Sequence, residues 1–514
     1  MKDQPKSKWR WRILRWGLIS LALLITLVAA VVTEENWRGK RDWEAYKKAA
    51  EARGEHLDVL AEPTNQIPDD QNFAKARVFD ALWAMKWDDK RPGWVADKPA
   101  ADPFKVSLTR SDGSWPKNEG GDFQRSTLID LQAWQKYYRN PAPKVAAEFP
   151  IAAQPQSPAA DILLALGKYD SAIEAWRLAS QRHYAHFSDQ LAAHGTPNMS
   201  LLLEYLSRTK ETVRFLQLRA VAELANGQND RAFDDVTLML DINGAVRQES
   251  VLIAHLVSLS TMVLALQPIY EGLVKHQWSD AQLVELQRRI GEKDFLADYQ
   301  RAMRGERAFG TDYFEALRHT RQYQTFDFSS GSNRITTINL RLVPAAFFYQ
   351  SELTTATLYE QDCLPLVDLD QRLVSPDTVR RTTAAVQAEL RHYNPYKVLA
   401  LMTFPATSKS VEKFASIQTY ADLAQVACAL ERYRLAHGDY PETLAVLAPQ
   451  YIEKLPHDIM NGQPLHYRHT DGGNFILYSV GWNETDDGGE LVLNKNNGMV
   501  DREKGDWVWD SAGK

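Results

Sequence analysis

The chain has 514 residues, a net charge of −6, and 44% hydrophobic and 25% charged residues. This length suits roughly two to four domains, and the composition excludes wholesale disorder and a polytopic membrane protein. The acidic balance argues against a general nucleic-acid-binding protein. With only Cys363 and Cys428, a disulfide-rich scaffold and a four-cysteine zinc site are also excluded.

The N-terminus predicts a membrane anchor. Residues 1–12 form a basic tail, and residues 13–33 contain the uncharged run WGLISLALLITLVAAVV. This length approaches the roughly 20 residues that span a bilayer. Because positive charge stays inside, we expect a single-pass membrane protein with a cytoplasmic N-terminus and the rest of the chain after residue 34 across the membrane. A cleaved signal peptide is the alternative, since Val28 and Ala30 fit a cleavage rule, but the long apolar run favours an uncleaved signal anchor.

Residues 250–270 form a second uncharged stretch of spanning length. Its interior contains His255, Gln267, Pro268 and several hydroxyl residues, whose polar groups would lack partners in lipid. The pattern therefore favours a buried helix within a folded domain. A second membrane span is the alternative, and it would return the C-terminus to the cytoplasm.

The rest of the chain divides into three predicted parts. Residues 34–125 are typical of a charged helix that ends at Gly54, followed by a loop-rich linker. Residues 126–405 are expected to form a helical domain, because apolar residues recur at three- and four-residue spacing. Residues 406–514 predict a smaller α+β domain. The expected fold class is therefore mainly α, with a C-terminal α+β domain and one N-terminal transmembrane helix.

Two segments of the helical domain resemble each other. In each, a glycine (Gly167 or Gly227) follows an apolar helix, and a small alanine (Ala172 or Ala232) begins the next. This predicts a helix, a glycine stop and an antiparallel return helix. Gly167, Tyr169 and Ala172 resemble the turn of tetratricopeptide (TPR) repeats, but the second segment lacks the tyrosine and the spacing does not fit the roughly 34-residue period. We interpret these segments as irregular helical hairpins, with a short α-solenoid or an ordinary bundle as alternatives.

His183 and His186, together with Asp189 and His194, are the candidate catalytic cluster. On a helix this spacing would place two or three of these side chains on one face, as a metal site requires. The alternative function is accordingly a membrane-tethered hydrolase with its site in the helical domain. No HExxH, GxSxG or phosphate-binding glycine loop accompanies the cluster, which favours a structural or surface role. Asp234–Asp235 are expected on a solvated helix face without an acid–base role.

The C-terminal part predicts a helix over residues 411–437 that ends at Gly438, a short helix, and a hairpin around Asp471-Gly472-Gly473. These residues resemble the globular domain of the major, G-type pseudopilins of type II secretion. The matching segments, in chain order, are Ala429–Arg434 (ALERYR), Gly438–Pro441 (GDYP), Tyr451–Asp458 (YIEKLPHD), Gly462–Tyr467 (GQPLHY) and Tyr478–Gly481 (YSVG).

The resemblance covers roughly the last hundred residues, and the chain departs from the family upstream of them. A pseudopilin carries its helix directly behind a prepilin-peptidase signal, whereas the anchor WGLISLALL lacks that motif and lies far from the C-terminal helix. The resemblance therefore implies a pseudopilin-type head on a helical, membrane-tethered stalk, and not a polymerising pilus subunit. The whole arrangement also resembles membrane-anchored proteins of planctomycete and verrucomicrobial type, a likeness that implies no activity.

Major pseudopilins bind calcium in their late loop, so the resemblance implies a Ca²⁺ site in this chain. Asn483 and Asp506 fall at the positions of the family's two aspartates, with Asp486 and Asp487 between them. Oxygen ligands on a glycine-flexed loop suit Ca²⁺, although the neutral Asn483 would weaken binding. A solvated acidic turn is the alternative, and no other cofactor is expected.

The resemblance to pseudopilins implies that the membrane is a bacterial inner membrane and that the bulk of the chain is periplasmic. We therefore expect an extracytoplasmic interaction or scaffold protein without catalytic residues, associated with a secretion or envelope system. Its partners would be the membrane, through a single span, and proteins not yet identified, but not nucleic acid. Around a hundred residues suffice for an independent core, so residues 408–514 are expected to fold alone.

Overall fold

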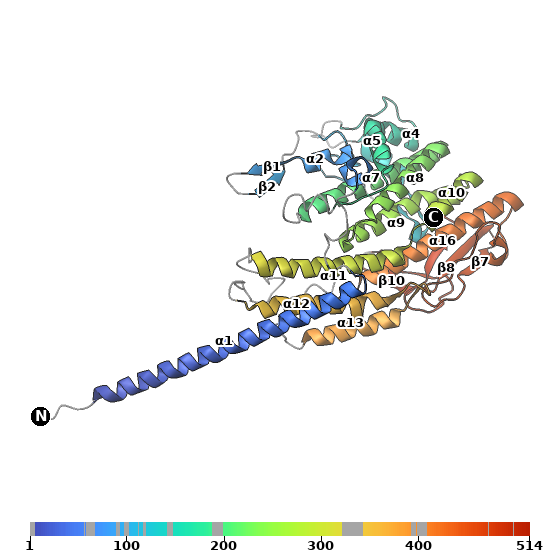
Figure 1. Ribbon diagram of the computed structural model, residues 1–514. Coiled ribbons are helices and arrows are strands. Elements are labelled where there is room, and N and C mark those ends of the chain that lie inside the picture. The colour runs from blue at the N-terminus through green and yellow to red at the C-terminus, as the bar shows by residue number, and fades with distance from the viewer. Residues whose placement is uncertain are drawn as a thin grey trace. The chain divides into compact units, whose positions relative to one another are not determined.

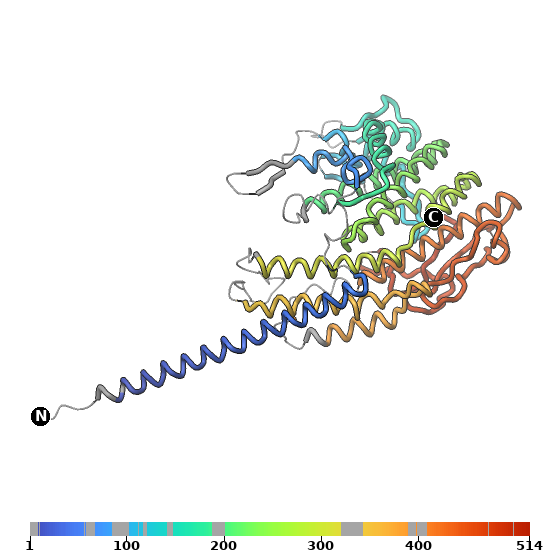
Figure 2. The backbone as a smooth tube through the Cα atoms, viewed as in Figure 1, coloured from blue at the N-terminus to red at the C-terminus, as the bar shows by residue number. Residues whose placement is uncertain are grey.

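The computed structural model describes residues 6–55, 57, 67–88, 93–96, 102–111, 113–116, 120–140, 148–187, 199–320, 343–391, 397, 409–470, 472–496 and 498–513. The protein is mainly helical, with a long apolar N-terminal helix and a small sheet near the C-terminus, as the sequence predicts (Figure 1 and Figure 2). The chain divides into two compact units. The anchor unit comprises residues 1–62, 306–363 and 383–406, and the main unit comprises residues 63–305, 364–382 and 407–514.

The anchor unit is built on α1 (Lys6–Ala52), α12 (Ala345–Leu358) and the C-terminal part of α11 (Phe295–Thr320). The second half of α1 packs on α12, where Trp43 and Ala50 are buried beside Tyr349 and Ala356. Asn36 Oδ1 accepts a hydrogen bond of 2.7 Å from the backbone N–H of Ala346, the second residue of α12. The apolar window in the first half of α1, by contrast, is not covered by any of the residues that the structure describes. The unit therefore joins an uncovered apolar helix to a packed helical core.

The main unit contains the remaining elements. Its helices are α2 (Asp80–Trp83), α3 (Leu131–Arg139), α4 (Pro158–Leu166), α5 (Asp170–Ser180), α7 (Met199–Ala225), α8 (Asn229–Val246), α9 (Leu252–Val274), α10 (Asp280–Gly291), the start of α11, the start of α13 (Pro376–Arg391) and α16 (Ser410–His437). Its strands are β1 (Met85–Asp88), β2 (Gly93–Ala96), β3 (Gly120–Asp122), β4 (Thr127–Ile129), β5 (Val367–Asp368), β6 (Leu373–Val374), β7 (His466–Thr470), β8 (Asn474–Ser479), β9 (Leu491–Leu493), β10 (Val500–Gly505) and β11 (Trp507–Asp510).

Helix α9, the second apolar stretch, is buried within the main unit against α7, α8 and α16. Several polar groups of α9 have partners there, although the ring nitrogens of His255 and the hydroxyl of Ser258 have none among the described residues. Asn243 of α8 donates to Thr261 Oγ1 (2.9 Å), and Gln267 both accepts from the backbone N–H of Phe123 (2.7 Å) and donates to the carbonyl of Thr127 (3.0 Å). These bonds satisfy groups that lipid would leave unpaired. The interpretation of residues 250–270 as a buried helix agrees with this packing.

The two expected hairpins differ in the structure. Gly227 takes the left-handed conformation (φ +73°) between α7 and α8, which pack on each other, as expected for a glycine stop. Gly167 instead keeps right-handed helical angles (φ −58°, ψ −20°). Accordingly α4 packs mainly on α3 and α7, and α5 packs on α8. Helix α4 does end at Gly167, and α5 begins after a short turn, as expected, but this glycine does not adopt the left-handed conformation.

The C-terminal part combines a long helix with an antiparallel sheet. Helix α16 ends at Gly438, whose φ of +91° gives the predicted left-handed cap. Strands β7 and β8 form the predicted hairpin, with His466 opposite Tyr478 and Thr470 opposite Asn474, and β11 adds to the other edge of β8. Helix α16 packs on β8 and β11 and also on α9 and α10. Residues 407–514 consequently belong to the same compact unit as the helices that precede them.

Candidate functional site

The late loop holds the four predicted calcium ligands in the main unit. Asn483 accepts a hydrogen bond from the backbone N–H of Thr485 (3.0 Å) and donates one to Asp487 (2.8 Å). Asp506 is fully buried and accepts from the backbone N–H groups of Asp487 (3.3 Å) and Gly489 (2.6 Å). Burial raises the pKa of Asp506 above its usual range, although the two backbone hydrogen bonds lower it. Asp506 thus stabilises the loop by accepting hydrogen bonds from two of the loop's backbone N–H groups.

Asp486, the fourth of these residues, points to other partners. It accepts from the hydroxyl of Tyr478 (3.1 Å) and the backbone N–H of Gly488 (2.9 Å), and it lies 3.4 Å from Nδ1 of His466. The hydrogen bond from Gly488 helps to hold the pKa of Asp486 below its usual range. Within the described parts of the chain, no three histidine, cysteine or acidic side chains gather as a metal-binding group. The Ca²⁺ site remains a prediction from the resemblance.

His183 and His186, the two described residues of the histidine cluster, do not lie on a helix. His183 and His186 occupy an extended segment in which Ala185 and Phe187 are buried. Asn72 holds this segment, because it donates to the carbonyl of His186 and accepts from its N–H, both at 3.1 Å. Residues three apart on an extended chain do not share one face. The expected helical face is therefore wrong for His183 and His186, while Asp189 and His194 lie outside the described residues.

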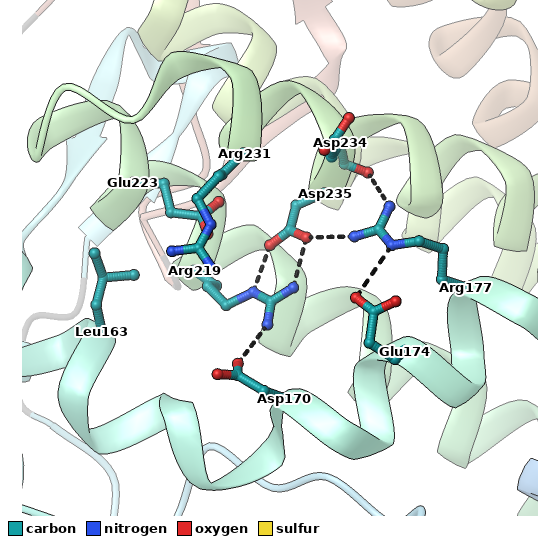
Figure 3. A pocket seen from close by; sticks show the side chains of 9 residues that line it. All are labelled: Leu163, Asp170, Glu174, Arg177, Arg219, Glu223, Arg231, Asp234 and Asp235. Carbon is teal, nitrogen blue, oxygen red and sulfur yellow. Dashed lines mark hydrogen bonds and ion pairs between the residues drawn. The ribbon is translucent and has the colours of Figure 1, made fainter.

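A charged cavity of about 240 Å³ lies among α4, α5, α7 and α8 (Figure 3). Its lining consists of one apolar side chain and eight charged ones: Leu163, Asp170, Glu174, Arg177, Arg219, Glu223, Arg231, Asp234 and Asp235. Helices α5 and α8, which supply several of these residues, also carry buried apolar side chains, Ala172 and Ile173 on α5 and Val236 on α8.

Arg219 of α7 and Asp235 of α8 form the central ion pair of the cavity. Nε and Nη2 of Arg219 donate to the two oxygens of Asp235, each at 2.6 Å, and Nη1 reaches Asp170 at 3.1 Å. Asp235 is only 1% exposed, so this two-pronged contact satisfies a carboxylate that could not otherwise be buried. Burial lowers the pKa of Arg219, but the charge and hydrogen bonds of Asp235, together with the charges of Glu223 and Asp170, outweigh burial and raise the pKa.

Arg177 of α5 closes a second side of the cavity. Its guanidinium lies 3.4 Å from Asp235, donates to the backbone carbonyl of Asp234 at 3.1 Å, and lies 3.6 Å from Glu174 (Figure 3). Asp235 therefore receives charge-assisted hydrogen bonds from two arginines on two different helices. This network ties α5 and α7 to α8.

Glu223 of α7 is the exception in this network. It is 4% exposed, and its Oε2 has no hydrogen-bond partner among the residues that the structure describes. Burial, and then the negative charge of Asp235, raise the pKa of Glu223 to about 8, although Arg219, Arg231 and Arg177 lower it. A carboxyl group that titrates near neutral pH and faces a cavity can exchange a proton for a bound cation.

The prediction from the sequence that Asp234 and Asp235 lie on a solvated helix face is wrong for Asp235, which is buried. Helical spacing places Asp235 between the buried Ala232 and Met239, on the same stripe as Val236. This helical spacing in the sequence therefore indicates that Asp235 is buried. The partner, Arg219, comes from a different helix, and no local pattern identifies it.

The chain matches no protein-family description, no curated protein and no solved structure. The fold itself defines the class: a mainly helical protein whose N-terminal apolar helix is not covered by the described residues, with a small C-terminal sheet.

Proposed function

We propose that this chain is a membrane-anchored, extracytoplasmic interaction or scaffold protein. The observation that carries the proposal is α1. No residue in the described part of the chain packs on its apolar window, whereas Trp43 and Ala50, further along the same helix, are buried in the anchor unit. An apolar helix of spanning length that continues unbroken into a folded core is suited to hold that core at a bilayer surface.

The basic N-terminal tail supports an orientation with a cytoplasmic N-terminus. If the chain were cut after Ala30, as the signal-peptide alternative requires, the packed half of α1 would stay with the mature protein. Anchor and signal peptide thus predict the same folded part but a different attachment to the membrane.

The pseudopilin-like head is a further part of the proposal, and two acidic residues of the matching segments support it by their place in the core. Glu431 is 1% exposed and accepts from Arg434 (2.7 Å) and from the hydroxyl of Tyr440 (2.9 Å). Asp458 is fully buried and accepts from the hydroxyl of Ser479 (2.9 Å). Such positions fix helix, turn and hairpin relative to one another. TPR-like hairpins and association with a secretion or envelope system complete the proposal.

Reporter fusions test the topology. Alkaline phosphatase joined after Thr33 and after Pro405 should be active, and β-galactosidase at the same points should be inactive, because both points would lie outside the cytoplasm. The mass of the purified chain should include residues 1–33, and alkaline carbonate should leave it in the membrane pellet. A cytoplasmic result after Pro405 would show that α9 spans and would overturn the proposed architecture, and a soluble chain lacking its first 30 residues would overturn the anchor.

A further inference from the structure

Glu223 leaves a buried acceptor that faces a cavity. Its Oε2 has no hydrogen-bond partner in the described part of the chain, and the residue is 4% exposed. A buried polar atom without a partner is costly, and native structures retain few of them. The same side chain lines the charged cavity (Figure 3). Either solvent or a ligand must supply the missing hydrogen bond.

The charges around the cavity favour a cation over an anion. Five of its lining residues are acidic (Asp170, Glu174, Glu223, Asp234 and Asp235), and three are basic (Arg177, Arg219 and Arg231). Two of the arginines are already committed, because Arg219 pairs with Asp235 and Asp170, and Arg177 pairs with Asp235 and Glu174. An anion would have to compete with these carboxylates for the arginines. A cation would instead offset the excess of acidic over basic side chains.

The size of the cavity restricts the ligand further. Its volume of about 240 Å³ lies below the roughly 300–1,000 Å³ of sites for drug-sized ligands and cofactors. It has room for one charged head group and a short stem, and Leu163 offers that stem an apolar contact. Ammonium and guanidinium groups on alkyl chains have this shape.

We propose that the cavity binds the ammonium or guanidinium group of a ligand, either a free alkylamine or a lysine or arginine side chain of a partner protein, with Glu223 as the buried counter-ion. The cation donates to Oε2 of Glu223, and its stem lies along Leu163. This site does not depend on whether α1 spans a membrane, so it stands apart from the proposed topology.

Binding of such a cation must be linked to release of a proton. The groups that face Glu223 are Arg219 on its own helix, Asp170, Glu174 and Arg177 on α5, and Arg231, Asp234 and Asp235 on α8. Together with burial they leave the pKa of Glu223 at about 8. A cation pairs with the ionised form, so affinity should rise with pH by up to about tenfold per unit below that pKa, and level off above it.

The test is calorimetric titration of the full chain in detergent micelles. The probes are 1,4-diaminobutane, propylguanidine, and the tripeptide amides Gly-Lys-Gly and Gly-Arg-Gly with an acetylated N-terminus. Gly-norleucine-Gly is the uncharged control, and inorganic phosphate is the anionic one. We expect at least one cationic probe to bind, with affinity rising between about pH 6 and 8. Binding of diaminobutane or propylguanidine without binding of the peptides identifies a small free cation as the source, and binding of the peptides alone identifies a partner side chain.

The variants separate the proposed contact from general electrostatics. Glu223→Gln keeps the shape of the side chain. It should lower the affinity for the cationic probe at least tenfold and remove the pH dependence of that affinity. Glu174→Gln makes the same charge change in the same cavity, but Glu174 is a mostly exposed residue, so the effect should be less than threefold. Leu163→Phe leaves every charge in place and narrows the cavity, so it should also lower the affinity for the cationic probe. Failure of all cationic probes to bind, equal binding by Glu223→Gln, or binding of phosphate alone would overturn the proposal.

Discussion

Glu223 makes the free energy of unfolding depend on pH in an unusual direction. Its pKa is about 8 in the folded protein, against an ordinary value of 4.5. Between these values the unfolded chain has lost this proton while the folded chain keeps it. The folded state then binds more protons, so the contribution of Glu223 to stability falls as pH rises through this window. Most ion-paired carboxylates act in the opposite direction, with lowered pKa values that stabilise the protein above their titration.

Replacement of Glu223 by glutamine should therefore stabilise the protein at alkaline pH. We expect Glu223→Gln and the natural chain to have similar unfolding free energies near pH 5, and the variant to be more stable by a few kcal/mol, to order of magnitude, near pH 8. Urea unfolding of both chains across this range measures the difference. Glu174→Gln serves as the control and should show no such trend. A difference that is constant with pH would mean that Glu223 is ionised in the folded protein.

The effect of calcium on stability tests the predicted site in the late loop directly. Glu484, Asp486, Asp487 and Glu490 place like charges on one loop, and a divalent cation would offset their repulsion. Calcium at a hundredfold excess over Kd should raise the unfolding free energy by about 2.7 kcal/mol. We expect a higher melting temperature in millimolar calcium than in chelator, and magnesium should imitate it poorly.

Asp506→Asn is the matched variant for that measurement. The substitution also weakens the hydrogen bonds to the N–H groups of Asp487 and Gly489, so its melting temperature should fall even in chelator. The informative quantity is the difference between calcium and chelator, which the variant should lose. If the natural chain melts at the same temperature in both, the loop is the solvated acidic turn and the amide contacts of Asp506 alone order it.

At the scale of elements, the packing of α1 on α12 depends on a close approach at Gly39. A Cβ atom at Gly39 would lie 3.3 Å from Cβ of Tyr349, which is tighter than ordinary van der Waals contact. Gly39→Leu should therefore push α1 from α12 and destabilise the anchor unit by about 1–3 kcal/mol, as overpacking commonly does. Thermal unfolding and limited proteolysis in detergent measure this.

Gly17→Leu is the control on the same helix, because a Cβ at Gly17 meets no atom within 4 Å. It should leave both measurements unchanged. Equal effects of the two variants would show that helix propensity, and not the contact with Tyr349, governs the result.

The elements that the sequence predicts well are those with local signals. Helix α16 ends where Gly438 supplies a left-handed residue, and the β7–β8 hairpin follows from alternating apolar positions. The elements that it misses depend on distant partners. The extended conformation of His183 and His186 is held by Asn72, more than a hundred residues away, and the charged cavity depends on Arg219 meeting Asp235 across two helices. Local periodicity carries no information about either contact.

At the scale of the whole molecule, α16 has neighbours on two sides. Towards the helices, Phe414 lies near Tyr299 with ring centroids 5.5 Å apart, and Gln418 accepts from the backbone N–H of Phe295 at 2.8 Å. Towards the sheet, α16 packs on β8 and β11. Its buried residues accordingly surround the helix instead of forming one stripe. The length of the C-terminal part favours independent folding, but this double packing favours dependence on the preceding helices.

The fragment of residues 408–514 decides between these two expectations. Expressed alone, it would expose the face of α16 that α9 and α10 cover, and the fully buried Phe414 would lose its neighbours His255 of α9 and Tyr299 of α11. Exposing apolar area costs roughly 25 cal/mol per Å², so loss of a whole helix face is large compared with the stability of a hundred-residue domain. We therefore expect the fragment to bind a hydrophobic dye and to unfold in urea without the sharp transition of the full chain. A sharp transition at the full chain's midpoint would instead establish the C-terminal part as an autonomous head, as the resemblance to pseudopilins implies, and would make its contact with α9 and α10 an interface between domains.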